Sequence, residues 1–408
     1  MPNAICRLCG DVLGGSALSL LQMPVCNRFT ARPEAGERHD FSLQQCPHCR
    51  LIQLSTPPPV SAVTPTLPWI RYREPDAHLD DLADRLLAEH GAKAATSLGV
   101  GPFDSPLLDR LERRGLRASA LEICPARRSD GLAVYPYLET WQLGLNAEHL
   151  AGVAGTHGTA DLVCCRYLLE HCHDPVGALR GLRQLLSAEG LLIVEVPDSS
   201  KFLAACDYSF IWEEHVSYFV EPTLRRLAAR AGYEVAGFYR VPGELEDALI
   251  AVLRPARADA DENINPPCSA TATMFQSYVA NFGPNRDFVR SWVAKAAGPA
   301  GDGLALFGIG HQAVMFAHLM GVSDHIATAV DDDPDKRGYF PPGFRVSVAP
   351  SEVLLRDTRT RTCLFAIAPQ IEQKVRSRLA PLAQRGVEFR SIFAGVPGSL
   401  LPGSPPWH

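Results

Sequence analysis

The sequence predicts an α/β protein in which a small cysteine-rich N-terminal module precedes two Rossmann-like sheets. Three observations predict this fold class. Two Cys-x-x-Cys motifs lie near the start, strand-like and helical runs alternate along most of the chain, and two strands lead into glycine-containing turns that are followed by helices. Because 408 residues exceed one ordinary core, we expect three parts, at residues 1–56, 69–254 and 269–400.

Composition and charge exclude several classes of protein. The net charge of −6 provides no basic field for nucleic acid, and no apolar run approaches the roughly 20 residues that span a bilayer. The N-terminal residues lack the hydrophobic region of a signal peptide. We therefore expect a cytoplasmic protein that binds neither nucleic acid nor membrane. Its twelve cysteines are expected to be metal ligands or buried thiols rather than disulfides.

The first module carries Cys6-x-x-Cys9 and Cys46-x-x-Cys49. Each pair can place two thiolates on one metal, and two such pairs complete a closed tetrahedral site for a structural Zn²⁺. The sequence between the pairs is poor in apolar residues, so a module this small needs such a metal for stability. A redox-active cysteine pair is the alternative interpretation.

A proline-rich connector, residues 56–68, is expected to be extended and without folded elements. Apolar residues between Asp76 and His90 then recur at helical spacing and predict an amphipathic helix. Tyr72 lies just before this helix, where it can reach a cleft. A tyrosine that serves only in packing is the alternative.

The first glycine turn follows a predicted strand at 94–100 and contains Leu98, Gly99 and Gly101. It precedes a predicted helix at 105–114, and glycine lets the backbone approach a ligand closely. The next predicted strand carries Glu122 near its end, where a carboxylate can accept hydrogen bonds from both hydroxyls of a ribose. An ordinary tight turn with a surface glutamate is the alternative.

Further strands and helices complete the expected central sheet, which is open and mostly parallel. The predicted strands are 161–165, 191–196, 234–240 and 248–253, the predicted helices are 175–186 and 222–231, and a turn is expected at 188–190.

The stretch from Trp212 to Phe219 is the strongest candidate for chemistry. It places Glu213, Glu214 and His215 side by side among aromatic and apolar residues, after the strand at 191–196. A histidine beside carboxylates can be held as a neutral imidazole, which general-base catalysis near pH 7 requires. Ligands of such sheets lie at the carboxyl ends of the strands, so this stretch and the first glycine turn face one crevice. A solvated acidic turn with a helix-capping histidine is the alternative.

The last third of the chain predicts a second nucleotide-type α/β domain. After a polar boundary at 254–268 and a helix at 275–297, a strand leads into Gly308-x-Gly310-x-x-Ala and a helix. The strand at 326–330 ends in Asp331, about 20 residues after the glycines, which is the spacing of a dinucleotide fold. A further strand at 362–368 and a helix at 371–383 follow. A Rossmann-like body without a ligand is the alternative.

These motifs resemble those of the sugar C-methyltransferases that act on nucleoside-diphosphate keto-deoxysugars. The four cysteines match the zinc module of that family, and residues 167–175 and 193–197 match its central segments. Residues 214–219 (EHVSYF) match its active-site signature, and Gly308, Gly310 and Asp331 match its C-terminal domain.

The resemblance implies a class I methyltransferase-type core that binds S-adenosylmethionine and a C-terminal domain that helps to hold a nucleotide-sugar. It implies that His215 is the base, assisted by Glu214 and Tyr72. The implied cofactor-binding residues are Leu98, Gly99, Gly101, Glu122, Cys165 and Arg166, and the implied substrate-binding residues are Trp212, Tyr218, Gly308, Gly310 and Asp331. We expect a monomer or a weak homodimer.

The chain departs from the family pattern mainly where ligands are bound. The first glycine turn lacks its acidic start, Arg166 replaces an asparagine, and Trp212 replaces a tyrosine. A Gly-Gly-Ser expected near residues 243–249 reads Gly-Glu-Leu-Glu-Asp-Ala-Leu, and no asparagine follows the strand at 362–368. These changes favour an altered acceptor. Two alternatives are a different natural-product acceptor and a methyltransferase-like binding protein without activity.

Overall fold

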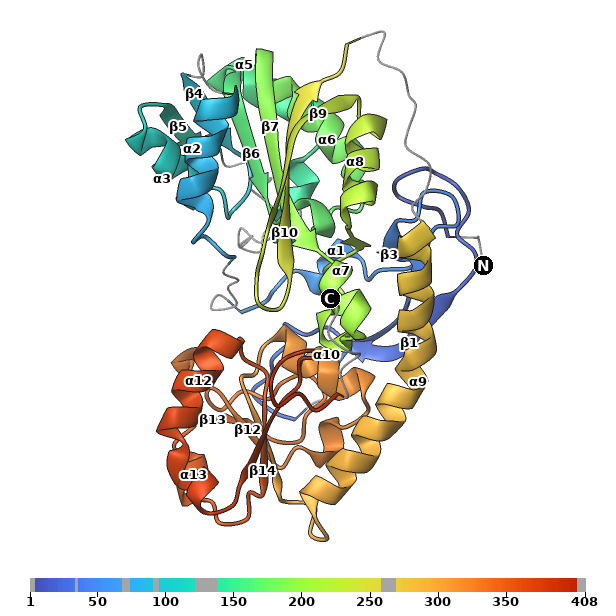
Figure 1. The fold of residues 1–408 in the computed structure, drawn as a ribbon, viewed down its shortest axis with the longest axis vertical. Coiled ribbons are helices and arrows are strands. Elements are labelled where there is room, and N and C mark those ends of the chain that lie inside the picture. Colours follow the sequence, from blue (N-terminus) through green and yellow to red (C-terminus); the bar gives the residue numbers. More distant parts are fainter. Residues whose placement is uncertain are drawn as a thin grey trace.

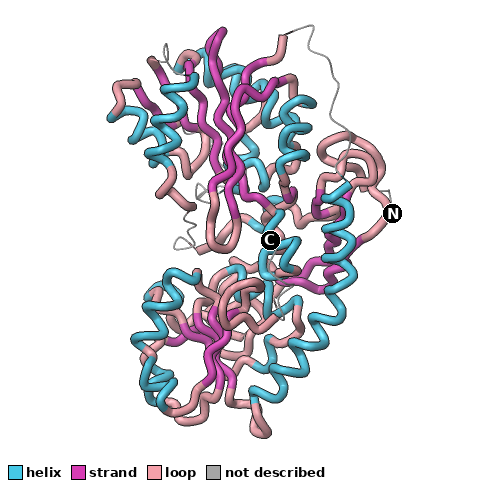
Figure 2. The backbone as a smooth tube through the Cα atoms, viewed as in Figure 1, coloured by secondary structure: helices cyan, strands magenta, loops and turns pink. Residues whose placement is uncertain are grey.

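A computed structural model describes residues 4–33, 36–67, 74–90, 95–121, 123, 138–257 and 269–401. The structure contains three sheets in these residues, and Figure 1 shows the central sheet above the C-terminal one, with the N-terminal strands beside both. Helices and strands alternate in both larger units, as Figure 2 shows by colour. The α/β fold class predicted from the sequence is confirmed.

The central sheet has the strand order β5-β4-β6-β7-β10-β9, and β10 is its antiparallel member. The strands are β4 (Thr96–Gly99), β5 (Arg117–Ala120), β6 (Ala160–Arg166), β7 (Leu186–Asp198), β9 (Tyr233–Val241) and β10 (Asp247–Pro255). The order reverses at β4, whose neighbours are β5 and β6. In open α/β sheets such a reversal creates the crevice in which ligands bind.

Alternation along the buried strands explains why helices cover both faces of this sheet. Leu162 and Cys164 of β6 pack with one group of helices, whereas Val163 and Cys165 pack with the other. The first group is α2 (Leu79–His90) and α3 (Ser105–Arg113), and the second is α5 (Ala147–His157), α6 (Pro175–Leu182) and α8 (Glu221–Arg230). Smaller helices are α4 (Leu138–Trp141) and α7 (Ser200–Ala205).

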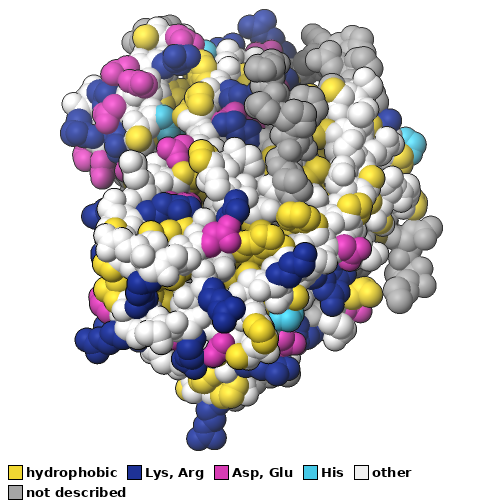
Figure 3. Space-filling model, turned by 60° about the horizontal axis from the view of Figure 1, so that its bottom comes forward, with side chains coloured by type: hydrophobic (Ala, Val, Ile, Leu, Met, Phe, Trp, Pro, Cys, Tyr) yellow, Lys and Arg dark blue, Asp and Glu magenta, His cyan; other side chains and the backbone are white. Residues whose placement is uncertain are grey.

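The C-terminal sheet is parallel throughout, in the order β13-β12-β11-β14-β15. Its strands are β11 (Leu304–Phe307), β12 (Thr328–Val330), β13 (Val348–Ala349), β14 (Thr362–Phe365) and β15 (Glu388–Ser391). The helices of this part are α9 (Ser269–Ala297), α10 (His311–Leu319), α11 (Val353–Arg356), α12 (Pro369–Arg378) and α13 (Ala380–Gln384). On the face shown in Figure 3, Lys and Arg side chains are separated by apolar and neutral ones rather than gathered into one patch.

The N-terminal sheet is antiparallel and includes a strand from the middle of the chain. Its order is β1-β2-β3-β8, with β1 (Ala17–Pro24), β2 (Arg38–Gln45), β3 (Ile52–Leu54) and β8 (Ser217–Tyr218). Because β8 lies two residues after His215, pairing of Ile52 with Tyr218 joins the cysteine module directly to the candidate catalytic stretch.

Four sequence expectations for this scaffold are wrong in detail. The connector at 56–68 contains a short helix, α1 (Val60–Val63). β7 starts at Leu186 and runs through the turn expected at 188–190. α9 starts at residue 269 instead of 275. The N-terminal module is not poor in core residues, because Leu20, Phe29 and others pack in one cluster with α9 and α10. No helix in the described part of the chain is long and apolar enough to cross a membrane.

Candidate active site between the central and C-terminal sheets

A cleft of about 680 Å³ lies between the central sheet and the C-terminal domain. Its walls come from the segment before α2, the connections that follow β6 and β7, the hairpin between β9 and β10, and the starts of α10 and α12. Most of these segments follow the carboxyl ends of strands, where the fold class places a ligand.

His215 lies in the wall of this cleft and is partly buried. Its ring stands edge-on to that of His171, with centroids 4.7 Å apart, and lies 4.7 Å from the ring of Trp212. Burial lowers the pKa of His215 well below its ordinary value, and the neighbouring His171 and His311 lower it further. The imidazole is therefore neutral at pH 7, the form that can accept a proton.

The carboxyl group of Glu170 lies close to this pair of histidines. One ligand atom each from Glu170, His171 and His215 lies within 4.8 Å of the others. The Glu170 side chain is 2% exposed, and neither of its carboxyl oxygens has a hydrogen-bond partner in the described part of the chain. Burial raises the pKa of Glu170 well above its ordinary value, which favours the protonated carboxyl.

The first glycine turn is closed by Asp104. Its carboxylate accepts hydrogen bonds from the backbone N–H groups of Val100 (2.8 Å), Gly101 (2.6 Å) and Arg166 (2.9 Å). Burial raises the pKa of Asp104 to about 7, although these N–H groups oppose the shift. A Cβ atom on Gly99 would lie 2.7 Å from Cβ of Asp104, so only glycine fits there.

This turn contacts the end of β6, and the residue that follows β6 lines the cleft. A Cβ atom on Gly101 would lie 3.5 Å from the carbonyl oxygen of Arg166, and the next residue, Tyr167, lines the cleft together with His215. A ligand cradled by the glycine turn would thus lie beside the wall that contains His215. The turn, the strand reversal at β4 and the adjoining cleft fit S-adenosylmethionine.

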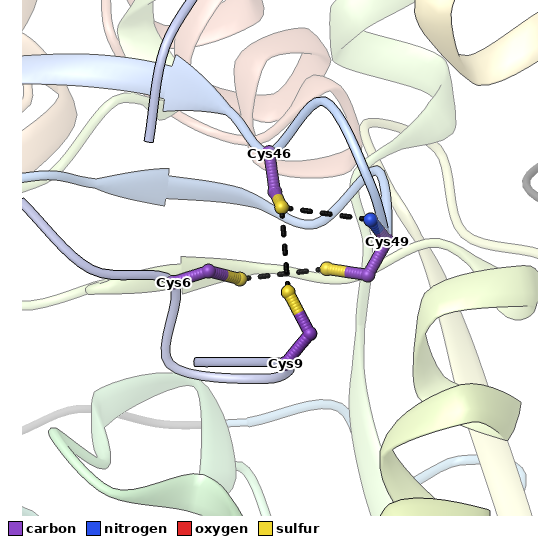
Figure 4. A group of neighbouring side chains, drawn as sticks. All are labelled: Cys6, Cys9, Cys46 and Cys49. Carbon is purple, nitrogen blue, oxygen red and sulfur yellow. Dashed lines mark hydrogen bonds between the residues drawn. The ribbon is translucent and has the colours of Figure 1, made fainter. Parts of the chain in front are cut away.

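The four cysteines of the N-terminal module converge, as Figure 4 shows. Sγ of Cys6 lies 3.4 Å from Sγ of Cys49, and Sγ of Cys9 lies 3.5 Å from Sγ of Cys46. In a tetrahedral site with Zn–S bonds of about 2.3 Å, the sulfur atoms are about 3.8 Å apart. The cluster therefore fits a zinc ion.

Comparison with known proteins decides what kind of protein this is. Residues 70–236 match the family model of a methyltransferase domain, and residues 268–393 match that of the C-methyltransferase C-terminal domain. The C-methyltransferase NovU of Streptomyces niveus is 26% identical over 377 residues, which cover 84% of each chain. The chain belongs to the C-methyltransferase family. It is an S-adenosylmethionine-dependent methyltransferase, and the resemblance inferred from its motifs is confirmed.

Solved structures of other methyltransferases match part of the chain. The 1,6-didemethyltoxoflavin-N1-methyltransferase of Burkholderia thailandensis is 17% identical, with a TM-score of 0.31 over 45% of this chain and 80% of its own. Magnesium protoporphyrin IX methyltransferase of Synechocystis is 14% identical, with a TM-score of 0.32 over 46% of this chain and 91% of its own.

In this C-methyltransferase the carboxylates of the Glu213-Glu214 pair reach toward the N-terminal module. Glu213 accepts hydrogen bonds from the backbone N–H and the thiol of Cys26. Glu214 accepts a hydrogen bond of 2.8 Å from the side-chain amide of Asn27. The role predicted for Glu214, the orientation of His215, stays a prediction, and the structure also brings Glu170 and His171 together with His215. Sequence analysis missed both residues of this pair, although they form part of the family motif that it quoted.

The Arg166 side chain connects several segments of the methyltransferase core. Its guanidinium pairs with Glu195 of β7 and donates to the carbonyl oxygens of Phe103 (2.6 Å) and Pro75 (2.8 Å). Nε2 of His78 lies 2.8 Å from the other oxygen of Glu195. The Arg166 side chain is thus used within the protein, where it fixes the glycine turn and the segment before α2. We infer that it acts on the cofactor only through this positioning.

The other predicted cofactor residues that the structure describes lie at or near the glycine turn, although the side chain of one of them, Cys165, cannot contact a ligand. Leu98 and Gly99 are the last residues of β4. The Cys165 side chain is fully buried in the core on the α5 and α6 face, so only its backbone can contact a ligand. Tyr72 and Glu122 lie outside the described residues, and their proposed roles stay predictions.

The predicted substrate residues lie in two places. The Tyr218 hydroxyl is held by the backbone of Trp212, from whose N–H it accepts a hydrogen bond of 2.9 Å. Gly308 and Gly310 flank a turn closed by Asp331, which accepts a hydrogen bond from the N–H of Ile309 (2.7 Å) and pairs with Lys336 (2.8 Å). This Asp331 carboxylate is therefore already engaged within the C-terminal domain.

Proposed function

We propose that this enzyme methylates the carbon α to the ketone of a nucleotide-linked keto-deoxysugar, with His215 as the base. The observation that carries the proposal is the neutral, partly buried His215 imidazole in the wall of a cleft that begins where β6 leaves the glycine turn. The NovU relative and the C-methyltransferase C-terminal domain support transfer to carbon.

The reaction needs a base that takes the proton, a group that stabilises the enolate charge, and a methyl donor in line with the attacking carbon. His215 takes the α-proton, and the electrons of the C–H bond enter the enolate. S-adenosylmethionine supplies an electrophilic methyl group on a sulfonium. As the new carbon–carbon bond forms, the sulfur keeps the electrons of the broken bond, and the proton leaves through His215 to solvent. Alignment of the reactants can contribute ~7–11 kcal/mol to lowering such a barrier.

His171 has a different role from His215. Its ring is edge-on to that of His215 and buried, in the turn that follows β6. Because it is 2% exposed and lines neither the cleft nor the small pocket beside it, we assign it to holding the ring of His215 in place. Tyr72 is proposed as the group at the carbonyl oxygen of the acceptor, where a hydroxyl donor stabilises the developing enolate charge.

We further propose that Cys6, Cys9, Cys46 and Cys49 bind one structural Zn²⁺. All four positions of a tetrahedral site are then filled by protein, so the ion activates no water. It holds the module whose strand β3 pairs with β8, next to His215.

Product analysis tests the function. The purified enzyme is incubated with S-adenosylmethionine that carries a ¹³C-methyl group and with a nucleoside-diphosphate 4-keto-deoxysugar. The expected product carries the label on a carbon next to the ketone, as seen by NMR. Label on oxygen or nitrogen, or turnover only with acceptors that lack a ketone, would contradict the proposal.

A further inference from the structure

Glu170, His171 and His215 form a group of side chains with the composition of a transition-metal site, which we call the histidine cluster. One ligand atom from each residue lies within 4.8 Å of the other two. Glu170 and His171 belong to the turn after β6, whereas His215 lies just before β8. Two imidazoles and one carboxylate suit ions such as Zn²⁺, Ni²⁺ and Fe²⁺, whereas Mg²⁺ and Ca²⁺ prefer oxygen ligands.

The carboxyl group of Glu170 is the observation that points to a ligand. Its side chain is 2% exposed, and neither of its oxygens has a hydrogen-bond partner among the residues that the structure describes. Burial of a polar group without a partner costs free energy, and such groups are rare in folded proteins. A cation bound between Glu170 and the two histidines would remove this cost.

There is space for an ion next to the cluster. An inner pocket of about 10 Å³ is lined by Glu170, Glu246 and His215, among others. One water molecule requires roughly 10–15 Å³, so the pocket is of the size that a metal ion or its bound water occupies. In the described part of the chain, no lysine or arginine lines this pocket. It therefore offers two carboxyl groups and an imidazole to a divalent cation.

The backbone brings the three ligands together. The N–H of Val216 donates a hydrogen bond of 2.9 Å to the carbonyl oxygen of Glu170, which joins the two segments beside the cluster. The rings of His171 and His215 are inclined by 89°, with centroids 4.7 Å apart. In a tetrahedral site with Zn–N bonds of about 2.0–2.1 Å, the ligand atoms are about 3.3 Å apart. Small side-chain rotations are thus sufficient to close the cluster around an ion.

We propose that the histidine cluster binds one divalent transition-metal ion, such as Zn²⁺, at a site separate from the four cysteines, and that this ion switches the base off. The effect on activity rests on the function proposed above. A neutral imidazole has one nitrogen with a free lone pair, and its other nitrogen carries a proton. When the lone pair of His215 binds the metal, neither nitrogen can accept the α-proton, whichever nitrogen faces the ion.

The two metal sites differ in their ligands. Four cysteines fill every position of the N-terminal site, whereas the histidine cluster supplies three ligands and leaves one position of a tetrahedral ion to water. The cluster also lacks sulfur. The two sites can therefore be distinguished by spectroscopy and by the ease with which a chelator removes the ion.

Metal titration tests the site on the full-length enzyme that carries its cysteine-bound zinc. Equilibrium dialysis against Zn²⁺, followed by metal analysis, is expected to show a second equivalent per chain. Co²⁺ added to the same protein is expected to give the visible absorption of an ion bound by nitrogen and oxygen, without a sulfur-to-metal charge-transfer band. No second equivalent, or a second equivalent with that band, overturns the inference.

Variants locate the second equivalent. Glu170→Gln keeps the size of the side chain and removes the anionic ligand, and His171→Asn is the second variant. Each is expected to weaken binding of the second equivalent by at least roughly 10–100-fold, the loss that even a change to the outer shell of a metal site causes, and to retain the cysteine-bound zinc. His173→Asn is the control, because His173 lines neither the cleft nor the inner pocket. Unchanged binding in both cluster variants overturns the inference.

Turnover separates this inference from the proposed function. Methylation by the wild-type enzyme is expected to fall as the second equivalent binds, and a chelator that leaves the cysteine-bound zinc in place is expected to restore it. Inhibition without a second equivalent overturns the metal site. A second equivalent that leaves turnover unchanged overturns the switch and contradicts the role of His215 as the base, while the metal site stands. Metal stoichiometry tests the site whichever acceptor the enzyme uses.

Discussion

The indole of Trp212 stacks on the imidazole of His311, with ring centroids 4.2 Å apart and planes inclined by 18°. Trp212 belongs to the stretch that ends in the proposed base, whereas His311 is the first residue of α10 in the C-terminal domain. Because Trp212 also lies against His215 and His171, the C-terminal domain is in contact with the catalytic rings through one side chain.

This stack predicts that His311 positions the active site without taking a proton. His311→Ala is expected to lower kcat/KM roughly 10-fold. The variant loses a stacking interaction of about 0.5–1.5 kcal/mol, and the Trp212 ring is then no longer held in place. His311→Phe is expected to restore most of the activity, and donor affinity stays unchanged. A histidine that works as an acid or base would not be rescued by phenylalanine, so failure of that rescue would reject the positioning role.

The pair of Arg166 and Glu195 predicts a large effect on stability. The side chains are 1% and 0% exposed, so removal of the cation leaves a buried charge. Arg166→Met is expected to lower the free energy of unfolding by about 3–5 kcal/mol. Arg166→Met with Glu195→Gln is expected to recover a substantial part of this loss. Urea unfolding measures both, and the exposed Arg230→Met is the control. An Arg166→Met enzyme as stable as the control would show that the pair of Arg166 and Glu195 does not stabilise the fold.

Removal of zinc is expected to affect activity through structure. One Zn²⁺ per chain should be found by mass spectrometry, and Cys46→Ser should lose it together with much of the activity, because β3 and β8 connect the module to His215. Cys363→Ser is the control, since Cys363 lies in the C-terminal sheet. A Cys46→Ser enzyme that retains both zinc and full activity would show that the four cysteines do not form the zinc site.

Buried acids predict that the ligand-free enzyme becomes less stable as the pH rises from 6 to 8. Burial raises the pKa of Asp207 to about 6, of Asp104 to about 7 and of Glu246 to about 8. A raised folded-state pKa contributes stability below the unfolded value, and this is lost as the pH rises through the folded value. We therefore expect Tm to fall between pH 6 and pH 8.

Opposing groups act below about pH 6.5. Burial lowers the pKa of His173, His311 and His318 to about 4, so the stability contributed by their neutral forms is lost as the pH falls below the unfolded value. Tm measured by calorimetry at constant ionic strength should hence be highest near pH 6. A Tm that rises steadily from pH 6 to pH 8 would contradict the ionisation states assigned to the cleft.

The periodicity of apolar residues was sufficient to predict most strands and helices, because the contacts that stabilise these elements follow the local pattern of apolar residues. It could not predict β8, a strand of two residues whose partner Ile52 is far away in the sequence. It also could not predict the start of β7, where residues 188–190 form an irregularity in the pairing with β6 between Leu186 and Leu191 instead of ending the strand.

For the site, the family motif located His215 but not its neighbours. Glu170 and His171 follow a different strand, and a backbone hydrogen bond from Val216 to the carbonyl oxygen of Glu170 brings the two segments together. Such a tertiary contact has no signature in either segment. Asp104 precedes Ser-Pro at a helix start, which is typical of a helix cap, but its side chain makes no cap hydrogen bond and closes the glycine turn instead.

The central claim, that His215 removes the α-proton of the acceptor, is tested most directly by hydrogen exchange. The enzyme, the keto-sugar acceptor and S-adenosylhomocysteine are mixed in D₂O, and deuterium in the recovered acceptor is followed by mass spectrometry. Because burial keeps the pKa of His215 well below 6.5, wild-type exchange should persist at pH 6.5. His215→Asn should slow it by roughly 10²-fold or more and leave affinity for S-adenosylhomocysteine unchanged. Exchange by that variant at more than about a tenth of the wild-type rate would contradict the account.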